Sequence, residues 1–397
     1  MKLFNSYHNS RIHSIINSDL WNFELSTWLH MIGWSVISIF IPILMLVAGY
    51  SLTAVLVYEA IFYLIDVPLN FVASYLTKTI GARAVVIIAT VIVAAYFITF
   101  RFISFGGWGI LIALALLAAL YDTFYWVAHL YLFMESSGSK KEISRNNGII
   151  TGIRSFGGML GPAIGAAILL FGNEFSLIAV SILFFVLSII PLLWLRHIKD
   201  IPQQDVSIKE FFKEPPEKRD FLSWFLYSIH LGVEGVMWPL FIFTLFGTLK
   251  SIALIAVIMS VSKIILSLIS GVVPSGRRNR IILLGILATL AVWIIRIVYP
   301  STVFYYVSIL IIGVLTVLIE VPLDSNIFER ARMKNQTLAS STYRNAIIML
   351  PQGILFLGLA LLVGVFKVSF GIAIASLVVL LITNQLIVYF TSNTTTK

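Results

Sequence analysis

The polar stretch RHIKDIPQQDVSIKEFFKEPPEKRD, residues 196–220, divides the sequence into two parts of similar length. Both parts consist mainly of apolar runs of about 20 residues or more, the length that an α-helix needs to cross the hydrocarbon core of a bilayer. Six runs precede the stretch and six follow it, and we number them as predicted spans 1 to 12. They lie at 22–48, 52–77, 83–103, 107–134, 147–170 and 174–196, then at 222–247, 249–273, 280–299, 303–327, 338–364 and 366–391.

The composition agrees with this pattern. Of the 397 residues, 59% are hydrophobic and only 11% are charged, whereas a soluble domain averages about 25% charged residues. This excludes an ordinary soluble enzyme and predicts an all-α integral membrane protein with twelve transmembrane helices in two six-helix halves. The chain has no cysteine, which removes disulfides, thiolate chemistry and cysteine-ligated metals.

The runs predict five segments. They are an N-terminal cytosolic tail at 1–21, a first six-helix half at 22–196, a cytosolic linker at 197–221, a second six-helix half at 222–391 and a cytosolic tail at 392–397. Most of the 27 Lys and Arg residues fall in the tails, the linker and the loops that follow spans 2, 4, 8 and 10. All of these segments lie on one side of the membrane. By the positive-inside rule this side is cytosolic, which predicts a multi-pass protein of the cell (plasma or inner) membrane with both termini inside. Topology therefore explains the net charge of +9, and we expect no nucleic-acid partner.

The two halves repeat each other. In span 5, Arg154 precedes Pro162, and in span 11 Arg344 precedes Pro351, at an offset of about 190 residues. Two parallel six-helix repeats joined by a cytosolic linker are the plan of the major facilitator superfamily. The chain resembles that superfamily over nearly its full length. The resemblance implies a transporter that works by alternating access.

The superfamily's loop motif between spans 2 and 3 is degenerate here. Gly81 and Arg83 match it, but Ser74 replaces its first glycine and Lys78 replaces its aspartate. The usual gating salt bridge of this loop therefore lacks its acidic partner.

Span 5 carries a better match, GGMLGPAIG at 157–165. Gly157, Gly158, Gly161, Pro162 and Gly165 resemble the Gly-Pro motif of the superfamily's proton-driven exporters. Glycines allow a neighbouring backbone to approach closely, and the proline permits a bend. The motif favours export, and the alternative is plain packing of small residues.

Two further features resemble a prokaryotic branch of the superfamily that has no assigned substrate. They are the pair Ile41-Pro42 in span 1 and the cluster of Tyr125, Trp126 and His129 in span 4.

Charged residues inside the spans follow the superfamily plan. Spans 3, 6, 9 and 12, which that fold places against lipid, have no charge between their ends. Each buried charge costs at least about 2.5–3.5 kcal/mol at the bilayer centre and needs a reason.

Four charges lie about 18–20 Å from the cytosolic ends of their helices, at 1.5 Å per residue. They are Asp66, Asp122, Glu234 and Lys263. A carboxylate in a low-dielectric cavity binds a proton more readily than one in water, so we expect proton coupling here. Asp66 and Glu234 are the leading carriers and Asp122 the third. Alternatively, Glu234 and Lys263 form a structural ion pair.

A second layer of charges lies nearer the cytosol. Arg154 is expected near His129 and within reach of Asp122. Arg344 lies at the depth of Glu320 on the neighbouring span, and contact with Asp66 across the interface of spans 2 and 11 is its alternative. We expect these groups to form gating or bracing contacts, with substrate contact as the alternative. Asp324 lies close enough to the interface for ordinary solvation to explain it.

Aromatic and basic residues of the central spans are candidates to line the substrate cavity. Packing and hydrogen bonding within the core are the alternative for each, above all for the histidines. The candidates are Trp34, Trp126, Trp238, His30, His230 and Lys263.

The pattern as a whole predicts a secondary active transporter, with proton-coupled export of an amphiphilic or cationic small molecule as the leading interpretation. A proton-coupled symporter for a sugar or organic anion and a passive facilitator are alternatives, and a membrane scaffold or receptor is a more distant one. No nucleophile, metal-ligand spacing or phosphate-binding glycine loop appears, so we expect neither an enzyme nor a cofactor. The expected partners are the substrate, protons and the lipid bilayer, and monomer is the superfamily's usual state.

Overall fold

The structure is a computed structural model. It describes residues 19–136, 146, 149–150, 152–154, 156–158, 160–161, 164–165, 167–168, 174–195, 201–202, 206–209, 218–247, 258 and 278–394. All regular structure within these ranges is helical. Nine of the described helices are long and apolar enough to cross a membrane. The prediction of an all-α membrane protein is confirmed.

The first half begins with a broken helix. Its elements are α2 (Asp19–Ser35), the 3-10 turn η1 (Ser38–Phe40) and α3 (Ile41–Val47), followed by α4 (Leu52–Ile80), α5 (Ala82–Phe100), η2 (Ile103–Phe105), α6 (Trp108–Ser136) and α8 (Glu174–Leu193). Pro42 stands in the first turn of α3. Because proline lacks an N–H and its ring clashes with the preceding turn, it fits the start of a new helix better than a helix interior.

The second half contains a π-helical turn in its first span. Its elements are α10 (Lys218–Gly232), η3 (Val233–Met237), α11 (Trp238–Phe246), α13 (Arg278–Val298), α14 (Thr302–Met333), α15 (Thr337–Ala360) and α16 (Val365–Thr394). The π turn η3 carries Glu234 and ends just before Pro239. Such turns are rare and occur frequently at functional sites.

Two predicted spans fall largely outside the described residues. They are span 5 at 147–170 and span 8 at 249–273, and Pro162 and Lys263 lie outside the described residues. The division into five segments stays a prediction.

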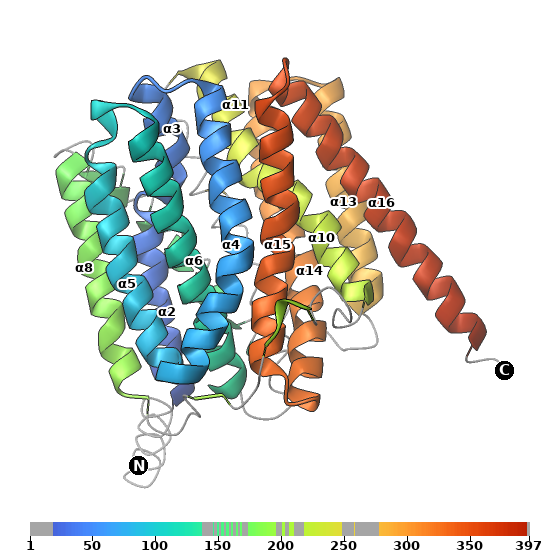
Figure 1. Ribbon diagram of the computed structural model, residues 1–397. Coiled ribbons are helices and arrows are strands. Elements are labelled where there is room, and N and C mark those ends of the chain that lie inside the picture. Colours follow the sequence, from blue (N-terminus) through green and yellow to red (C-terminus); the bar gives the residue numbers. More distant parts are fainter. Residues whose placement is uncertain are drawn as a thin grey trace, which may run out of the picture.

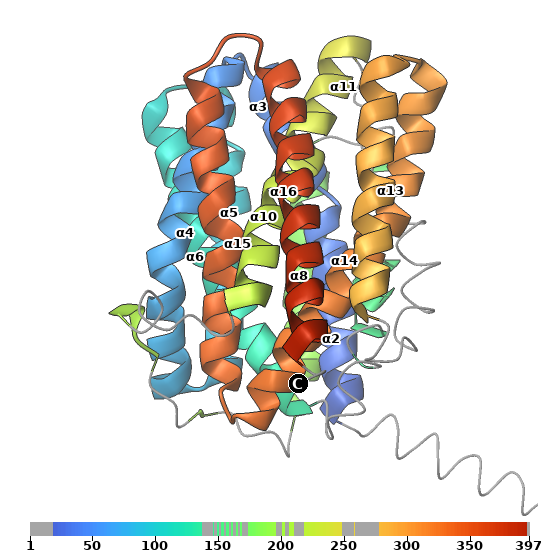
Figure 2. The same ribbon diagram turned by 90° about the vertical axis from the view of Figure 1, so that its right-hand side faces the viewer.

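The halves meet along α4 and α15, which lie side by side at the centre of the molecule (Figure 1). The close approach is visible at Gly353 of α15, where a Cβ atom would lie 2.7 Å from a side-chain carbon of Leu64 on α4. Helices α5 and α8 stand on one flank and α13 and α16 on the other (Figure 1). In the turned view, α13 and α16 face the viewer (Figure 2). The four flanking helices correspond to predicted spans 3, 6, 9 and 12.

The glycines of span 5 pack against α2. A Cβ atom at Gly157 would lie 3.0 Å from the carbonyl oxygen of Trp28, and one at Gly161 would collide with Ser35. Gly165 has its close neighbour in Val36, and Gly158 is half-buried in the same segment. The glycines therefore let α2 approach at backbone distance. Whether the motif also serves export stays a prediction.

Candidate transport site

Two aspartates from different helices meet in the first half. Asp66 of α4 is fully buried and Asp122 of α6 is 9% exposed. Their carboxyl groups lie within hydrogen-bonding reach of each other. Oδ2 of each aspartate is nevertheless buried without a hydrogen-bond partner. A carboxylate oxygen can only accept, so two ionised carboxylates cannot satisfy one another.

An asparagine from each half connects this pair to the interface. The Asn70 side chain donates to Asp66 Oδ1 at 2.7 Å, and Asn345 of α15 donates to Asn70 Oδ1 at 2.8 Å. Asn345 and Trp126 also lie beside the carboxyl group of Asp122. Neither asparagine was expected from the sequence, because the expectation rested on charged residues alone. The sequence did contain one indication of this contact, because Asn70 lies one helical turn after Asp66 and therefore on the same face of the helix.

Glu234 has a different partner from the expected one. Arg296 of α13 holds both its carboxylate oxygens, at 2.5 and 3.0 Å. The guanidinium also donates to Ser308 at 2.8 Å and lies 3.6 Å from the ring centroid of Trp238. Arg296 stands near the end of a predicted lipid-facing span, but it is only 3% exposed. The expected partner, Lys263, lies outside the described residues.

The expected pairing of Arg344 with Glu320 is wrong. Arg344 donates to both carboxylate oxygens of Asp324, at 2.6 and 2.8 Å, and lies over the ring of Trp224. Asp324 is only 7% exposed, so the ion pair rather than solvation explains its charge. Glu320 lies one turn earlier on α14 and interacts electrostatically with Arg154.

The structure brings Arg154 and His129 together. Arg154 Nη2 lies 2.8 Å from His129 Nε2, and its guanidinium carbon lies 4.9 Å from the ring centroid of Trp126. Because a guanidinium can only donate, the histidine accepts this bond with a neutral ring. These groups connect α6 to the segment that carries the Gly-Pro motif.

Three of the expected cavity residues are packed within the halves. His30 is bonded to the Tyr121 hydroxyl at 2.7 Å and stacks on Tyr125. His230 accepts from the indole N–H of Trp293 at 3.1 Å, and Trp238 is 1% exposed beneath Arg296. A fourth, Trp126, lies beside the carboxyl group of Asp122.

A cavity of about 450 Å³ lies between the halves and is lined by residues of α3 and α11 among others. These two helices lie at the same end of the molecule (Figure 1). Trp34 lines the cavity, as expected, together with residues of α4 and of η3 and α11. The cavity also contains Glu59 of α4, which is 5% exposed and was not among the residues expected from the sequence. Its volume falls in the range typical of small-molecule sites.

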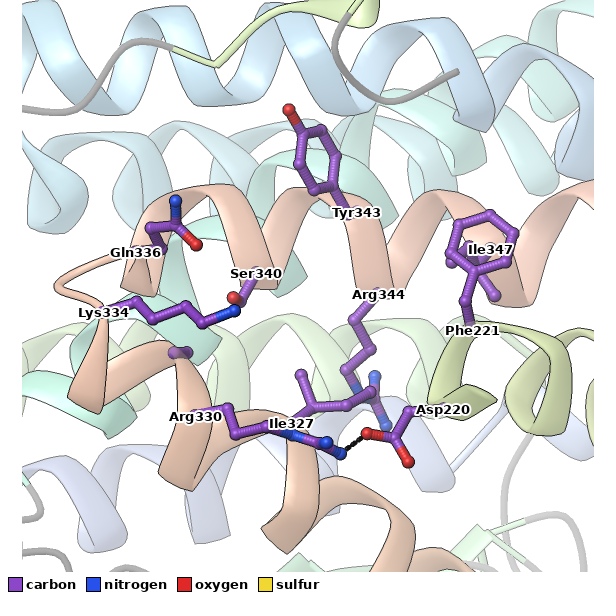
Figure 3. A pocket seen from close by; sticks show the side chains of 11 residues that line it. Asp220, Phe221, Ile327, Arg330, Lys334, Gln336, Ser340, Tyr343, Arg344 and Ile347 are labelled. Carbon is purple, nitrogen blue, oxygen red and sulfur yellow. Dashed lines mark ion pairs between the residues drawn. The ribbon is translucent and has the colours of Figure 1, made fainter. Parts of the chain in front are cut away.

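At the opposite end, where α10 begins, described residues of the two halves contact each other. Glu135 of α6 pairs with Arg332 of α14 at 2.7 Å and accepts from the Thr337 hydroxyl at 3.1 Å. Figure 3 shows a small pocket lined by residues of α10, α14 and α15, where Asp220 pairs with Arg330. Its volume is about 40 Å³, which leaves no room for a substrate of ordinary size.

The loop between α4 and α5 braces the first half internally. Gly81 links the two helices with a φ of 91°, a conformation that favours glycine. Arg83 donates to the carbonyl oxygen of Leu195, beyond the end of α8, at 2.6 Å. Among the described residues, no group of His, Asp and Glu has the arrangement of a metal site.

Comparison with solved structures finds the same fold in known transporters. The human organic anion transporter MFSD10 (TETRAN) is 12% identical with a TM-score of 0.67, over 91% of this chain and 98% of that chain. A bacterial homologue of the iron transporter ferroportin, solved in an outward-facing state, is 15% identical with a TM-score of 0.70, over 92% and 98%. At these identities the likeness shows the fold alone. No curated protein matches the sequence.

A family comparison assigns the sequence itself. The model of the Major Facilitator Superfamily matches residues 24–356, which is most of the chain. The two structures agree with the helical architecture, and the family match points to transport rather than enzymatic catalysis. The chain belongs to the Major Facilitator Superfamily and is a multi-pass membrane transporter.

Proposed function

We propose that this transporter is coupled to protons and that Asp66 and Asp122 together carry the exchanged proton. The observation that supports this is the adjacent pair of buried carboxyl groups, each with an unpartnered Oδ2. One proton between them would give both oxygens a partner and relieve the repulsion of two like charges in a medium of low dielectric constant. Loading and release of that proton is the coupling step.

The surroundings of Glu234 favour a structural role instead. Both of its oxygens are held by Arg296, and the pair is almost completely buried. Such a pair would have to break before its carboxylate could exchange a proton. The Asp66–Asp122 pair needs no such step.

Alternating access is supported by the asymmetry of the two ends. The Glu135–Arg332 contact joins the halves at one end, and the 450 Å³ cavity lies between them towards the other. If the Glu135–Arg332 ion pair breaks and the cavity closes, the Asp66–Asp122 pair would become accessible from the opposite side of the membrane.

The leading substrate is an amphiphilic or cationic small molecule, and the Gly-Pro motif favours its export. The described lining of the cavity contains a carboxylate and aromatic rings but neither lysine nor arginine. A cavity for an organic anion would need a cation. Of the three basic residues that could supply one, Arg154 and Arg344 bind other side chains, and Lys263 lies outside the described residues. MFSD10 is an organic anion transporter, and that substrate class is a property of MFSD10 alone.

The orientation follows from the position of the basic residues. Arg330, Arg332 and Lys334 lie together at the end where α10 begins, and Lys78 and Arg83 lie where α4 joins α5. By the positive-inside rule this end faces the cytosol, in the plasma or inner membrane. We take the monomer as the working unit.

The test is proton flux in proteoliposomes that contain a pH-reporting dye, under an imposed pH gradient. Tetraphenylphosphonium, ethidium, sugars and organic acids are added in turn to wild type, Asp66→Asn and Asp122→Asn. We expect the cations alone to elicit proton movement, and either substitution to abolish it. Glu24→Gln, which removes a buried carboxyl group on α2, is the matched control.

Three results would contradict the proposal. Substrate movement without proton movement would indicate a facilitator, and proton movement with sugars or acids alone would indicate a symporter. Loss of coupling in Glu234→Gln, with both aspartate variants still coupled, would move the proton site to the second half.

A further inference from the structure

We propose that Glu59 and the aromatic residues around it form the binding site for the positive charge of a lipophilic organic cation. The inference rests on the proposed function, since it names the substrate class and the residue that recognises it. Glu59 was not among the residues expected from the sequence, and the proton site lies elsewhere.

Glu59 is placed to meet a substrate that enters between the halves. It lies in the outer part of α4, seven residues after the helix begins at Leu52. Its side chain lines the 450 Å³ cavity, whose opposite wall is formed by residues of η3 and α11 from the second half. A molecule bound there would touch both halves at once, which a substrate must do to favour one state over the other.

The carboxylate has no partner to neutralise it in the described part of the chain. It is 5% exposed, and it forms neither a hydrogen bond nor an ion pair with any described residue. A buried charge without a partner is costly and is normally paired. A bound cation would supply the missing charge.

The walls of the cavity suit the rest of such a molecule. Trp34, Phe62 and Tyr63 line it beside Glu59, and aromatic faces attract organic cations while aromatic bodies bury apolar surface. Among the described lining residues Glu59 is the only one with a formal charge. The site therefore matches a ligand with one positive charge and a large apolar body.

The site also lies close to the proton pair. Asp66 follows Glu59 by seven residues, two helical turns, which places both on one face of α4 about 10 Å apart. Tyr63 lies between them and interacts electrostatically with Glu59, Asp66 and Asp122. A cation at Glu59 would thus raise the positive potential around the proton pair, which favours release of the proton and gives antiport a physical basis.

The test measures equilibrium binding of radiolabelled tetraphenylphosphonium to purified protein in detergent, without membrane or gradient. Tetraphenylborate, an anion of the same shape, is the competitor. For Glu59→Gln we expect an increase in Kd of about 30-fold, the effect of removing one partner of a buried charge pair. Glu59→Asp, which keeps the charge, should weaken binding less, and Glu24→Gln should leave Kd within about twofold.

The result is independent of proton coupling. Unchanged affinity in Glu59→Gln, or equal loss in Glu24→Gln, would overturn the assignment. Tetraphenylborate that binds wild type as tightly as the cation would also overturn the assignment. This comparison uses wild type alone and therefore tests the assignment even if Glu59→Gln does not fold. Binding that depends on Glu59 in a protein without proton flux would refute the proposed coupling and leave the cation site intact. Proton flux in a protein whose cation binding does not depend on Glu59 would refute the cation site and leave the proposed coupling intact.

Discussion

Replacing Arg296 by methionine should destabilise the second half strongly, because it leaves Glu234 charged and alone inside the protein. The two side chains are 1% and 3% exposed, so solvent does not screen the lost interaction. Breaking a buried pair from one side costs about 3–5 kcal/mol. Loss of the guanidinium over Trp238, 3.6 Å from its ring centroid, acts in the same direction.

The assay is unfolding in mixed micelles by sodium dodecyl sulfate, followed by tryptophan fluorescence. The free energy of unfolding should fall by about 3–5 kcal/mol in Arg296→Met. In the double variant Glu234→Met/Arg296→Met no uncompensated charge remains, so at least half of the loss should return. Arg101 offers a control, because it lies near the end of predicted span 3 as Arg296 lies near the end of predicted span 9, but its side chain is exposed.

Arg101→Met should change the free energy of unfolding by no more than about 0.5 kcal/mol. A loss below about 1 kcal/mol in Arg296→Met would show that the pair contributes no more than a surface salt bridge. A double variant less stable than the single one would show that the uncompensated charge of Glu234 is not the cause. Either result would refute the structural role assigned to this pair.

Two further perturbations test the contacts between elements. Glu135→Gln removes the ion pair between the halves, which is partly exposed and contributes about 0.5–1 kcal/mol. Ser341 is buried, and the chain has no cysteine of its own, so Ser341→Cys introduces a single thiol. Glu135→Gln should make maleimide labelling of this thiol a few times faster. An unchanged rate would show that the ion pair does not hold the halves together at this end. Gly161→Leu should abolish the folded, monodisperse protein in size-exclusion chromatography because a side chain there meets α2, whereas Gly109→Leu, with open space around it, should be tolerated. A well-folded Gly161→Leu would contradict the packing of this segment.

The fold could be predicted from the sequence because its main determinants are one-dimensional. Apolar runs give the spans, and depth along a helix follows from 1.5 Å per residue. That depth estimate put Asp66 and Asp122 at the same level, and the structure brings them together. The broken first span and the π turn at Glu234 were not predicted, since both depend on how neighbouring helices satisfy the backbone.

The partners of the arginines could not be predicted in the same way. Depth says nothing of the direction in which a side chain leaves the helix, and a long guanidinium side chain spans a full turn. Arg344 therefore pairs with Asp324 rather than with Glu320 one turn away. The place of Arg296 near a helix end suggests contact with solvent, whereas Glu234 of η3 holds it inside the protein.

The most direct test of the central claim is infrared difference spectroscopy of the carbonyl stretch of protonated carboxyl groups, recorded between acidic and alkaline samples. Other buried carboxyl groups, such as Glu24, contribute bands of their own, so the test concerns the band that belongs to the aspartate pair. If Asp66 and Asp122 share one proton, this band shifts in Asp66→Asn and also in Asp122→Asn, because each substitution removes one partner of the proton, whereas Glu24→Gln leaves it in place. A band of the aspartate pair that stays unchanged in either aspartate variant would contradict a shared proton and with it the proposed coupling site.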